Sequence, residues 1–182
     1  MPDVAHPPSA WVRRFLGYIP AAGTVLDVAA GGGRHTRLCL EQGHPVTALD
    51  RDVAGLADLA GKPDLEVIKA DLESGGPWPL GGRRFAGVIV ANYLHRPLLP
   101  AIVAAVSPDG CLVYETFAVG NERFGRPSNP DFLLRPGELL DAVRGRLCVL
   151  AYENLEVTDP RPAVIQRIAA RNATAPFSTL QR

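Results

Sequence analysis

The chain has 182 residues, of which 47% are hydrophobic and 21% charged, with 19 basic and 19 acidic side chains. This length supports one well-filled core rather than two, so we expect a single domain over residues 1–182. The balanced charge, without a dense basic run, argues against a nucleic acid partner. No apolar run approaches the roughly 20 residues that span a bilayer and no signal peptide is evident, so we expect no membrane contact and a cytoplasmic location.

The cysteines and histidines show no metal-ligand spacing and no CxxC pair. Three cysteines lie far apart in the sequence: Cys39, Cys111 and Cys148. Unpaired cysteine is among the most buried residue types, so we predict buried free thiols, no disulfide and no metal site. His6 and His44 are expected at the surface, and His35 beside the glycine turn described below.

A helical segment is predicted at the N-terminus, within residues 1–22. Ser9 is a suitable N-cap. The apolar residues that then share one helical face are Trp11, Phe15, Leu16 and Ile19. Two roles stay open for this helix: it covers the edge of a sheet, or it helps to close a cofactor pocket.

A glycine triplet is the central motif of the chain. Residues 24–29 are strand-forming and lead into Gly31-Gly32-Gly33, after which a helical pattern runs to Gln42 and stops at Gly43. A side chain on such a turn would hold a ligand away from the backbone, and glycine adopts backbone angles denied to other residues. The free amides at the helix start then face a polar or anionic ligand group, which predicts a nucleotide-like cofactor.

An acidic residue ends the second predicted strand. Residues 44–49 lead into Asp50, about 20 residues beyond the glycine turn. A carboxylate in this position can accept hydrogen bonds from both hydroxyls of an adenosine ribose. The alternative is that this segment caps a helix over residues 54–60, a role that suits Asp52.

The third predicted strand, residues 65–70, brings Asp71 and Leu72 to the same edge of the sheet. Asp71 can accept a hydrogen bond from an exocyclic amine, and the Leu72 amide can donate to a ring nitrogen, so an adenine is expected there. Residues 74–82 hold four glycines and two prolines around Trp78. The helix expected in this place is therefore shortened or absent, with Trp78 exposed or folded back.

The apolar run 85–91 predicts a central parallel strand covered on both faces. It ends in Asn92-Tyr93-Leu94-His95, at the edge where ligands bind to open α/β sheets. A helix follows from Pro97 through Val106, and residues 107–110 have a turn sequence. Residues 111–117 are then the fifth strand.

A polar stretch without periodicity covers residues 118–135, in a substrate-side loop that reaches residue 136. Long loops at this edge of a sheet are usually functional. A helix starts at Pro136-Gly137-Glu138. Residues 147–157 and 163–171 are predicted strands whose connection is too short for a helical crossover, so the pair must be antiparallel. The tail, residues 172–182, is expected to be frayed.

Five features lie along this chain: residues 25–33, Asp50, residues 70–72, the strand ending at Asn92 and the closing hairpin. Taken together, they resemble class I S-adenosylmethionine-dependent methyltransferases over nearly the whole chain. The resemblance implies a Rossmann-like three-layer α/β sandwich. Its seven-stranded, mostly parallel sheet has the order 3-2-1-4-5-7-6, with strand 7 antiparallel. Compact members of the tellurite-resistance type share the helix start found here at residues 136–139.

The resemblance also implies S-adenosylmethionine as the cofactor. The implied cofactor-binding residues are Asp27, Ala29, Gly31, Gly33, Asp50, Arg51, Asp71, Leu72 and Asn92. Asp27 and the loop 29–33 would hold the methionine moiety, with Asn92 beside it. Asp50 would bind the ribose, and Asp71 with Leu72 the adenine.

The methyl group of a sulfonium is already activated, so such an enzyme must mainly align the acceptor and exclude water. If the acceptor must lose a proton, Tyr93 and His95 are the candidate catalytic residues, because they follow the fourth strand. Alternatively, Tyr93 packs on the cofactor and His95 caps the next helix.

Three arginines of the long loop, Arg123, Arg126 and Arg135, are candidates for binding an anionic substrate group. The alternative is that they are solvated, or paired with Glu122 and Asp131. With the helix between the third and fourth strands nearly missing and no inserted cap domain, the substrate wall must come from the N-terminal segment and the long loop.

Residues 92–95 differ from the Asn-Pro-Pro-Tyr motif of nucleic-acid and glutamine amino methyltransferases, which argues against an amide or exocyclic base nitrogen as acceptor. A small-molecule acceptor is therefore expected, with the oligomeric state open. Two other functions stay open: a non-catalytic S-adenosylmethionine-binding protein, and an NAD-binding oxidoreductase. The latter would prefer glycine at Thr36, where helix and strand pack closely. Methylation of RNA or protein is disfavoured by the neutral charge.

Overall fold

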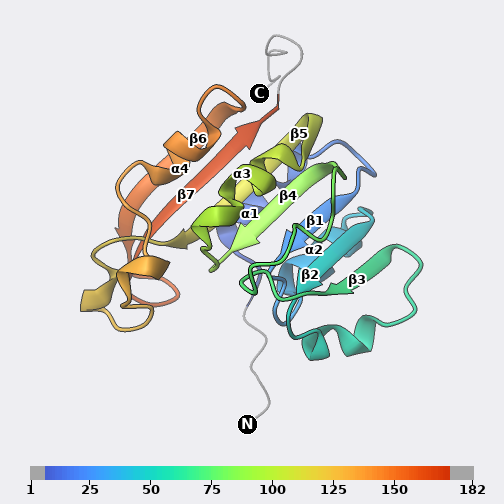
Figure 1. The fold of residues 1–182 in the computed structure, drawn as a ribbon, viewed down its shortest axis with the longest axis horizontal. Coiled ribbons are helices and arrows are strands. Elements are labelled where there is room, and N and C mark those ends of the chain that lie inside the picture. The colour runs from blue at the N-terminus through green and yellow to red at the C-terminus, as the bar shows by residue number, and fades with distance from the viewer. Residues whose placement is uncertain (1–6, 173–182) are drawn as a thin grey trace.

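A computed structural model describes residues 7–172, which form one seven-stranded sheet with helices on both faces (Figure 1). The strands are β1 (Val25–Val28), β2 (Val46–Asp50), β3 (Leu65–Lys69), β4 (Phe85–Ala91), β5 (Val106–Phe117), β6 (Cys148–Val157) and β7 (Ala163–Arg171). The α-helices are α1 (Ala10–Phe15), α2 (Arg34–Glu41), α3 (Leu99–Ala104) and α4 (Glu138–Val143). Short 3-10 helices are η1 (Leu16–Tyr18), η2 (Ala54–Leu59), η3 (Arg96–Leu98), η4 (Asn121–Arg123) and η5 (Pro130–Phe132).

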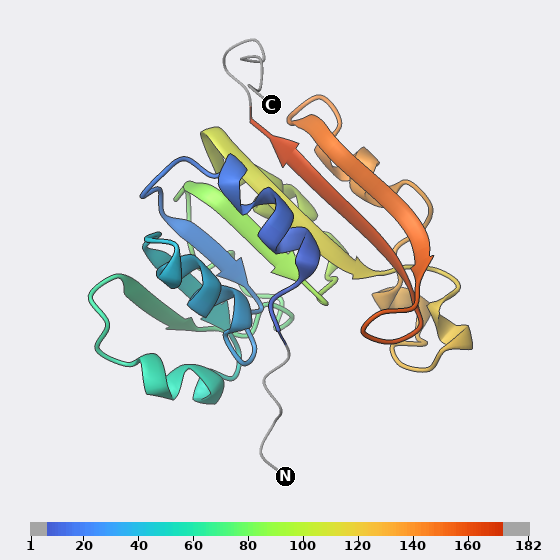
Figure 2. The same cartoon turned by 180° about the vertical axis from the view of Figure 1, so that it is seen from behind.

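The strand order is β3-β2-β1-β4-β5-β7-β6, and β7 runs antiparallel to both of its neighbours. The expected α/β sheet, with its order and its antiparallel seventh strand, is confirmed. Helices α3 and α4 lie on the face seen in Figure 1, whereas α1 and α2 lie on the opposite face in Figure 2. Because β1 to β4 are all parallel, their carboxyl ends meet at one edge of the sheet.

Each face of the sheet has its own apolar core. The core under α3 and α4 includes Phe85 and Tyr114, and the core under α1 and α2 includes Trp11 and Ile89. All four residues of β1 are buried. This double burial explains why β1 and β4 are nearly continuous apolar runs.

Helix α1 is fixed to the sheet by polar contacts as well as by its apolar face. The Ser9 hydroxyl caps the helix, accepting hydrogen bonds from the amides of Trp11 (3.1 Å) and Val12 (3.4 Å), as predicted. The Trp11 indole donates to the Ile168 carbonyl of β7 at 3.2 Å. The guanidinium carbon of Arg167 lies 4.6 Å from the centre of a Trp11 ring. The helix therefore covers the face of the sheet over β5 and β7, rather than an edge of the sheet as the sequence suggested.

No helix connects β3 to β4 in the described chain, as the run of glycine and proline predicted. Instead, Leu80 is buried and Trp78 is folded back to pack, half-buried, against the core on the α3 face. These two side chains cover apolar surface that a helix would otherwise cover.

Several expectations from the sequence were wrong in detail. Val106 starts β5 instead of ending a helix, because it pairs with Phe85 of β4. Residues 107–110, which were expected to form a turn, are a bulge within β5, after which Cys111 pairs with Gly87. The helix predicted over residues 54–60 is the 3-10 helix η2.

Two side chains also differ from prediction in their burial. Cys148 is exposed on the edge strand β6, whereas Cys39 and Cys111 are buried, and all three are free thiols. His44 is buried, with its Nδ1 3.0 Å from the Gly23 carbonyl oxygen, so it belongs to the packing around β2. His6 lies outside the described residues. Within residues 7–172, none of the helices is both long and apolar enough to cross a bilayer.

We predict that Trp11→Ala lowers the free energy of unfolding by about 3–5 kcal/mol, because a large side chain that is 2% exposed leaves a cavity. Urea denaturation followed by circular dichroism measures this loss. Val149→Ala, at a site that is 41% exposed, is the control and should change stability by less than about 0.5 kcal/mol. Equal effects of the two substitutions would contradict the importance of the α1 contact.

Candidate active site

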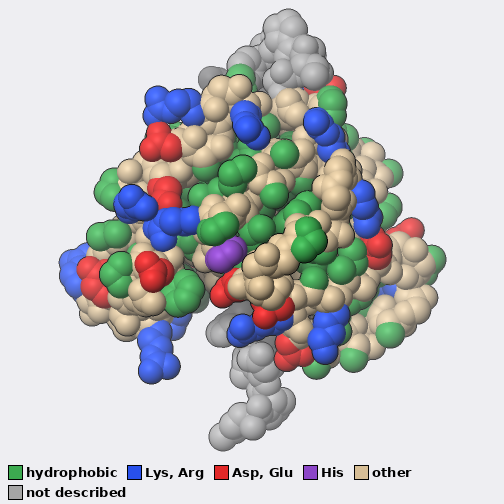
Figure 3. Space-filling model, viewed as in Figure 1, with side chains coloured by type: hydrophobic (Ala, Val, Ile, Leu, Met, Phe, Trp, Pro, Cys, Tyr) green, Lys and Arg blue, Asp and Glu red, His purple; other side chains and the backbone are tan. Residues whose placement is uncertain are grey.

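A cavity of about 400 Å³ opens at the carboxyl edge of the sheet. Its walls come from the ends of β1 to β4 and from the loop after β5. The lining residues are Ala29, Asp50, Arg51, Ala70, Asp71, Leu72, Glu73, Tyr93 and Phe132. On the face seen in Figure 3, apolar side chains gather in the middle, and acidic and basic side chains crowd the lower part. Six of the predicted site residues thus line one cavity: Ala29, Asp50, Arg51, Asp71, Leu72 and Tyr93.

The glycine turn has the backbone geometry that requires glycine. Gly31 and Gly33 have φ angles of +53° and +74°. A Cβ at Gly33 would lie 2.3 Å from Leu56, so this position is closed to any side chain. A Cβ at Gly31 or Gly32 would meet nothing within 4 Å. The turn therefore packs against η2 on one side and leaves open space beside its backbone on the other.

Arg37 holds this turn, and sequence reasoning missed it. Its guanidinium donates hydrogen bonds to the carbonyls of Gly32 and Gly55 and forms a 2.6 Å ion pair with Asp58. Arg37 lies one helical turn after Gly33, which places it over the loop from which the helix starts. A basic residue at this spacing was the available signal.

Asp50 joins the end of β2 to the glycine turn. Its Oδ2 accepts a hydrogen bond from the Gly31 amide at 2.7 Å, and its Oδ1 accepts one from the Asp52 amide at 2.9 Å. A carboxylate has about four acceptor sites, so roughly two remain for a ligand. Asp52 in turn accepts from the Ala54 amide at 3.1 Å, in agreement with its expected structural role.

A further acidic segment of the cavity wall follows β3. Asp71 is exposed, and its Oδ1 accepts a hydrogen bond from the Glu73 amide at 2.9 Å, which fixes the turn after Ala70. Glu73 lines the cavity too and was not singled out from the sequence. Asp50, Asp71 and Glu73 give the cavity an acidic wall, with Arg51 as the one basic side chain among its lining residues.

Asp27 is 1% exposed and does not line the cavity. Its Oδ2 accepts a hydrogen bond from the Thr36 hydroxyl at 2.7 Å, which links β1 to the first turn of α2. Burial raises the pKa of this carboxyl to about 6, against the opposing effect of hydrogen bonds from Thr36. The charged form of this carboxyl is therefore destabilised by its surroundings.

Tyr93 contributes the wall after β4. Asn92 has a left-handed φ of +56°, which turns the chain, and the Tyr114 hydroxyl donates to the Tyr93 carbonyl at 2.8 Å. The Tyr93 hydroxyl is buried without a hydrogen-bond partner in the described chain. Burial and the nearby Glu73 and Asp71 carboxylates raise its pKa well above 10, so at neutral pH it is a hydrogen-bond donor. Because buried polar groups are normally paired, the neighbouring Glu73 carboxylate is the acceptor that this hydroxyl can reach within the chain.

His95 and Asn92 lie near this wall in the chain but are not among the residues lining the cavity. His95 is half-buried, and its main-chain carbonyl accepts a hydrogen bond from the Leu98 amide at 3.0 Å. Its side chain makes no capping hydrogen bond to η3. The expectation that the His95 side chain caps the next helix is therefore wrong.

His35 follows the glycine turn, as expected, but is buried. Its Nε2 accepts a hydrogen bond from the Ser9 amide at 3.1 Å, and the Ser9 hydroxyl donates to Glu115 at 2.7 Å. Burial, with the charges of Arg34 and Arg13, lowers the pKa of His35 to about 3, so the imidazole is neutral. These contacts attach the N-terminal segment to the glycine turn, although none of its described residues lines the cavity.

The three loop arginines are exposed and do not line the cavity. Arg123 forms a 2.9 Å ion pair with Glu156 of β6, in place of the Glu122 or Asp131 partners considered from the sequence. Arg135 lies 4.0 Å from Glu138, with its side chain 74% exposed. The cavity wall receives Phe132 from this loop instead.

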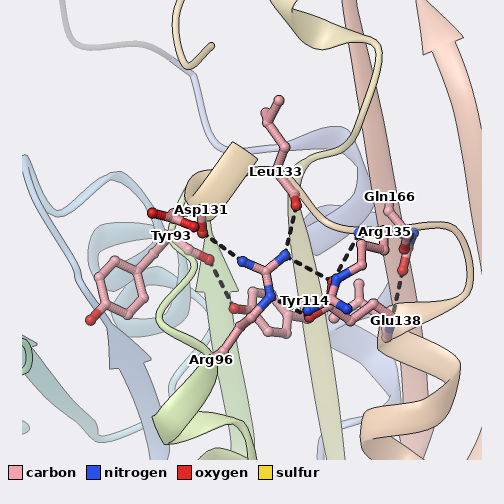
Figure 4. A network of polar contacts seen from close by, with 9 residues as sticks. Tyr93, Arg96, Tyr114, Asp131, Leu133, Arg135, Glu138 and Gln166 are labelled. Carbon is pink, nitrogen blue, oxygen red and sulfur yellow. Dashed lines mark hydrogen bonds and ion pairs between the residues drawn. The ribbon is translucent and has the colours of Figure 1, made fainter. Parts of the chain in front are cut away.

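Arg96 is the centre of a polar network that the sequence did not reveal (Figure 4). Its Nε donates to Glu138 at 2.6 Å, and its two terminal nitrogens donate to the carbonyls of Asp131 (2.7 Å) and Leu133 (2.8 Å). The same Glu138 accepts from the Arg135 amide at 2.8 Å. Although burial opposes ionisation of Glu138, these hydrogen bonds hold its pKa below the usual value.

Among residues 7–172, no group of three or more histidine, cysteine or acidic side chains has a metal-binding arrangement. The acceptors in the cavity are carboxylates that already bind main-chain amides.

Solved structures of methyltransferases share this fold. A 1,6-didemethyltoxoflavin N1-methyltransferase from Burkholderia thailandensis aligns over 91% of this chain and 80% of its own, with a TM-score of 0.63 and 22% identity. An S-adenosylmethionine-dependent methyltransferase from Mesorhizobium loti aligns over 90% and 98%, with a TM-score of 0.65 and 20% identity. TehB from Haemophilus influenzae aligns over 89% of this chain but only 61% of its own, with a TM-score of 0.67 and 16% identity.

No protein-family model matches the chain, and the search of curated proteins found no match. At the identities above, the structural likeness establishes the fold. The chain thus has the Rossmann-like fold of the S-adenosylmethionine-dependent methyltransferases, with the cavity at the carboxyl edge of the sheet.

We predict that Asp27→Asn stabilises the protein increasingly as the pH rises from about 4, with the full gain above about pH 6. Because the folded-state pKa of about 6 exceeds the ordinary 3.8, ionisation of Asp27 costs stability as the pH rises through this interval. An amide at this position still accepts from Thr36 but carries no charge. Thermal unfolding should show a gain of about 1–3 kcal/mol near pH 7.5 and none near pH 4. A variant that is less stable at both pH values would contradict this assignment.

Proposed function

We propose that this protein is an S-adenosylmethionine-dependent methyltransferase that acts on a small-molecule acceptor. The single observation that carries this proposal is the convergence of four chain segments on one cavity: Ala29 before the glycine turn, Asp50, the Asp71-Leu72 segment and Tyr93. Each follows a different parallel strand, and together they offer a backbone cradle, a ribose acceptor and an adenine site. The shared fold supports the same function.

The cofactor fits the groups on the cavity wall. The open space beside Gly31 and Gly32 suits the methionine moiety, with Ala29, Gly33 and the buried Asp27 shaping that end and Asn92 beside it. Asp50 has acceptor sites left for the ribose hydroxyls, with Arg51 next to it. The exposed Asp71 carboxylate and the Leu72 amide suit the edge of an adenine.

When bound, the cofactor would supply an activated sulfonium methyl group for transfer to the acceptor. The chain's own contribution is alignment and the exclusion of water. Tyr93, protonated at neutral pH, acts as a donor that orients a bound group. His95 is the candidate base for an acceptor that must lose a proton.

A small-molecule acceptor is supported by the toxoflavin methyltransferase, which was crystallised with its heterocyclic 1,6-didemethyltoxoflavin and with S-adenosylhomocysteine. The glycopeptide N-methyltransferase MtfA was likewise crystallised with S-adenosylhomocysteine. In this chain, Arg123, Arg126 and Arg135 border the acceptor side on the loop after β5 and would bind an anionic acceptor group. The free thiols are in keeping with a reducing compartment, so a cytoplasmic location is part of the proposal.

The two other functions make different predictions. A non-catalytic S-adenosylmethionine-binding protein would bind the cofactor without transferring its methyl group to any acceptor. An NAD-binding oxidoreductase would need close packing at Thr36, whose hydroxyl instead donates to Asp27. Calorimetric titration with S-adenosylmethionine, S-adenosylhomocysteine and NAD separates these functions, and acceptor screening with labelled methyl groups follows.

We predict that the wild-type protein binds S-adenosylhomocysteine with a micromolar dissociation constant and does not respond to NAD. Asp50→Ala should weaken this binding at least about tenfold, because it removes the ribose acceptor and releases the Gly31 amide. Glu156→Gln, at the exposed partner of Arg123, is a matched loss of one carboxylate outside the cavity and should leave affinity unchanged. Binding of NAD alone would overturn the proposal.

We also predict that Gly32→Ala impairs binding without impairing folding. Its added methyl meets no protein atom within 4 Å, so stability should change by less than about 1 kcal/mol, yet the methyl occupies space kept for the cofactor. Gly17→Ala, which adds a methyl in equally open space in η1, is the control. Calorimetry should show a loss of about tenfold or more for the first variant only. Equal affinities of Gly32→Ala and Gly17→Ala would refute the placement of the methionine moiety beside this turn.

A further inference from the structure

We propose that Arg96 is a positioning residue that holds the ring of Phe132 over the adenosine part of the bound cofactor, opposite Tyr93. This inference rests on the proposed function, since it concerns the same cavity. It assigns roles to two residues that the sequence motifs do not mark. It also makes the loop after β5, which borders the acceptor side, a part of the cofactor site.

The position of Phe132 is the first step. Phe132 ends η5, and its ring lines the cavity together with Asp50, Asp71 and Leu72, the residues that suit an adenosine. The side chain is 45% exposed, which is unusual for a large aromatic ring. A planar base beneath it would bury this apolar surface, and ring–ring contact is favourable in offset or edge-on geometry.

The second step is how the ring is held. Arg96 donates to the carbonyls of Asp131 at 2.7 Å and Leu133 at 2.8 Å, the residues on either side of Phe132. The Phe132 amide donates to the Asn129 carbonyl at 3.0 Å, and Leu133 is buried. Arg96 thus fixes the backbone on both sides of a ring that has little packing of its own.

The third step is how Arg96 itself is fixed. Glu138, the first residue of α4, binds the guanidinium through both carboxylate oxygens at 2.6 and 3.0 Å. The arginine side chain is 26% exposed and that of Glu138 15%, so this forked pair is shielded from water. In Figure 4 the guanidinium lies between Glu138 and the two loop carbonyls, while the Tyr93 ring projects away from this cluster.

Tyr93 completes the enclosure from the other side. It precedes Arg96 by three residues and lines the same cavity as Phe132, with its hydroxyl buried. One short segment after β4 thus supplies a ring to the wall and, through Arg96, places a second ring from a distant loop. A purine between the two would cover Phe132 and bring polar atoms near the Tyr93 donor.

Calorimetric titration with S-adenosylhomocysteine and with adenosine tests the role of Phe132. Phe132→Ala should weaken binding of both probes by about fivefold to tenfold, whereas Phe132→Tyr, which keeps the ring, should restore wild-type affinity. Phe124→Ala, at another exposed ring of the same loop, is the matched control and should have no effect. Wild-type affinity of Phe132→Ala for both probes would overturn the proposal while leaving the proposed function intact.

A double-mutant cycle tests whether Arg96 acts through Phe132. Arg96→Lys keeps the positive charge beside Glu138 but replaces three donor nitrogens by one. It should weaken S-adenosylhomocysteine binding about fivefold in the wild-type background and less than about twofold in the Phe132→Ala background. Equal losses in both backgrounds would show a general structural role and refute the positioning role. Arg144→Gln, which breaks the exposed ion pair with Asp141 of α4, is the control.

Hydrogen exchange supplies a readout that needs no ligand. Arg96→Lys should speed exchange of the Phe132 and Leu133 amides by about tenfold or more, while the amides of β4 keep their wild-type rates. Unchanged exchange of these two amides in Arg96→Lys would refute the role of Arg96 in holding the loop. If the wild-type protein binds neither probe, the proposed function and the adenosine contact both fail, and the exchange rates still decide whether Arg96 holds the loop.

Discussion

The hydrogen bond from the Gly31 amide to the Asp50 carboxylate, at 2.7 Å, is the contact on which the cavity depends. It joins the ends of two neighbouring parallel strands and fixes the glycine turn in a left-handed conformation. Because the same carboxylate also binds the Asp52 amide, the chain after β2 turns away from the sheet and leaves room above it. The cavity exists because these turns diverge while the strands beneath them stay paired.

Energetically unfavourable features gather at this edge. Ala29 and Asn92, at the ends of β1 and β4, have left-handed backbone although neither is glycine. Asp27 is a buried carboxyl with a raised pKa, and the Tyr93 hydroxyl is a buried donor without a partner. Each feature costs free energy in the unliganded chain, and the two apolar cores of the sheet offset this cost. A ligand that used these groups would recover part of it.

The loop after β5 is attached at both of its ends. At its start, Ala118 forms a bridge with Leu134, and the Asn121 amide oxygen accepts from Val164. At its end, Arg96 and Glu138 hold the main chain around Phe132. These contacts give a polar segment without periodicity a defined path along the site. The exposed side chains between the two attachments are free to meet an acceptor.

The amino-acid sequence by itself determined the sheet, its order and the segments that reach the carboxyl edge. Apolar runs, glycine turns and short connections are local patterns that predict the strands and the antiparallel hairpin, and the strand order follows from the resemblance that residues 25–33, Asp50 and residues 70–72 carry. Local patterns also identified Asp50, the Ser9 cap and the missing helix before β4. They did not find Arg37, Glu73, Arg96 or Phe132, and they misplaced His44 and Cys148.

Those residues owe their positions to contacts between segments far apart in the chain. Arg96 and Glu138 are 42 positions apart, and their pairing follows from the packing of α4 beside α3, the helix that follows Arg96. Whether a charged side chain is exposed, paired or buried depends on which neighbours the fold supplies, and no local spacing encodes those neighbours. The sequence therefore determined which edge of the sheet carries the site, and the tertiary structure decided which side chains enclose it.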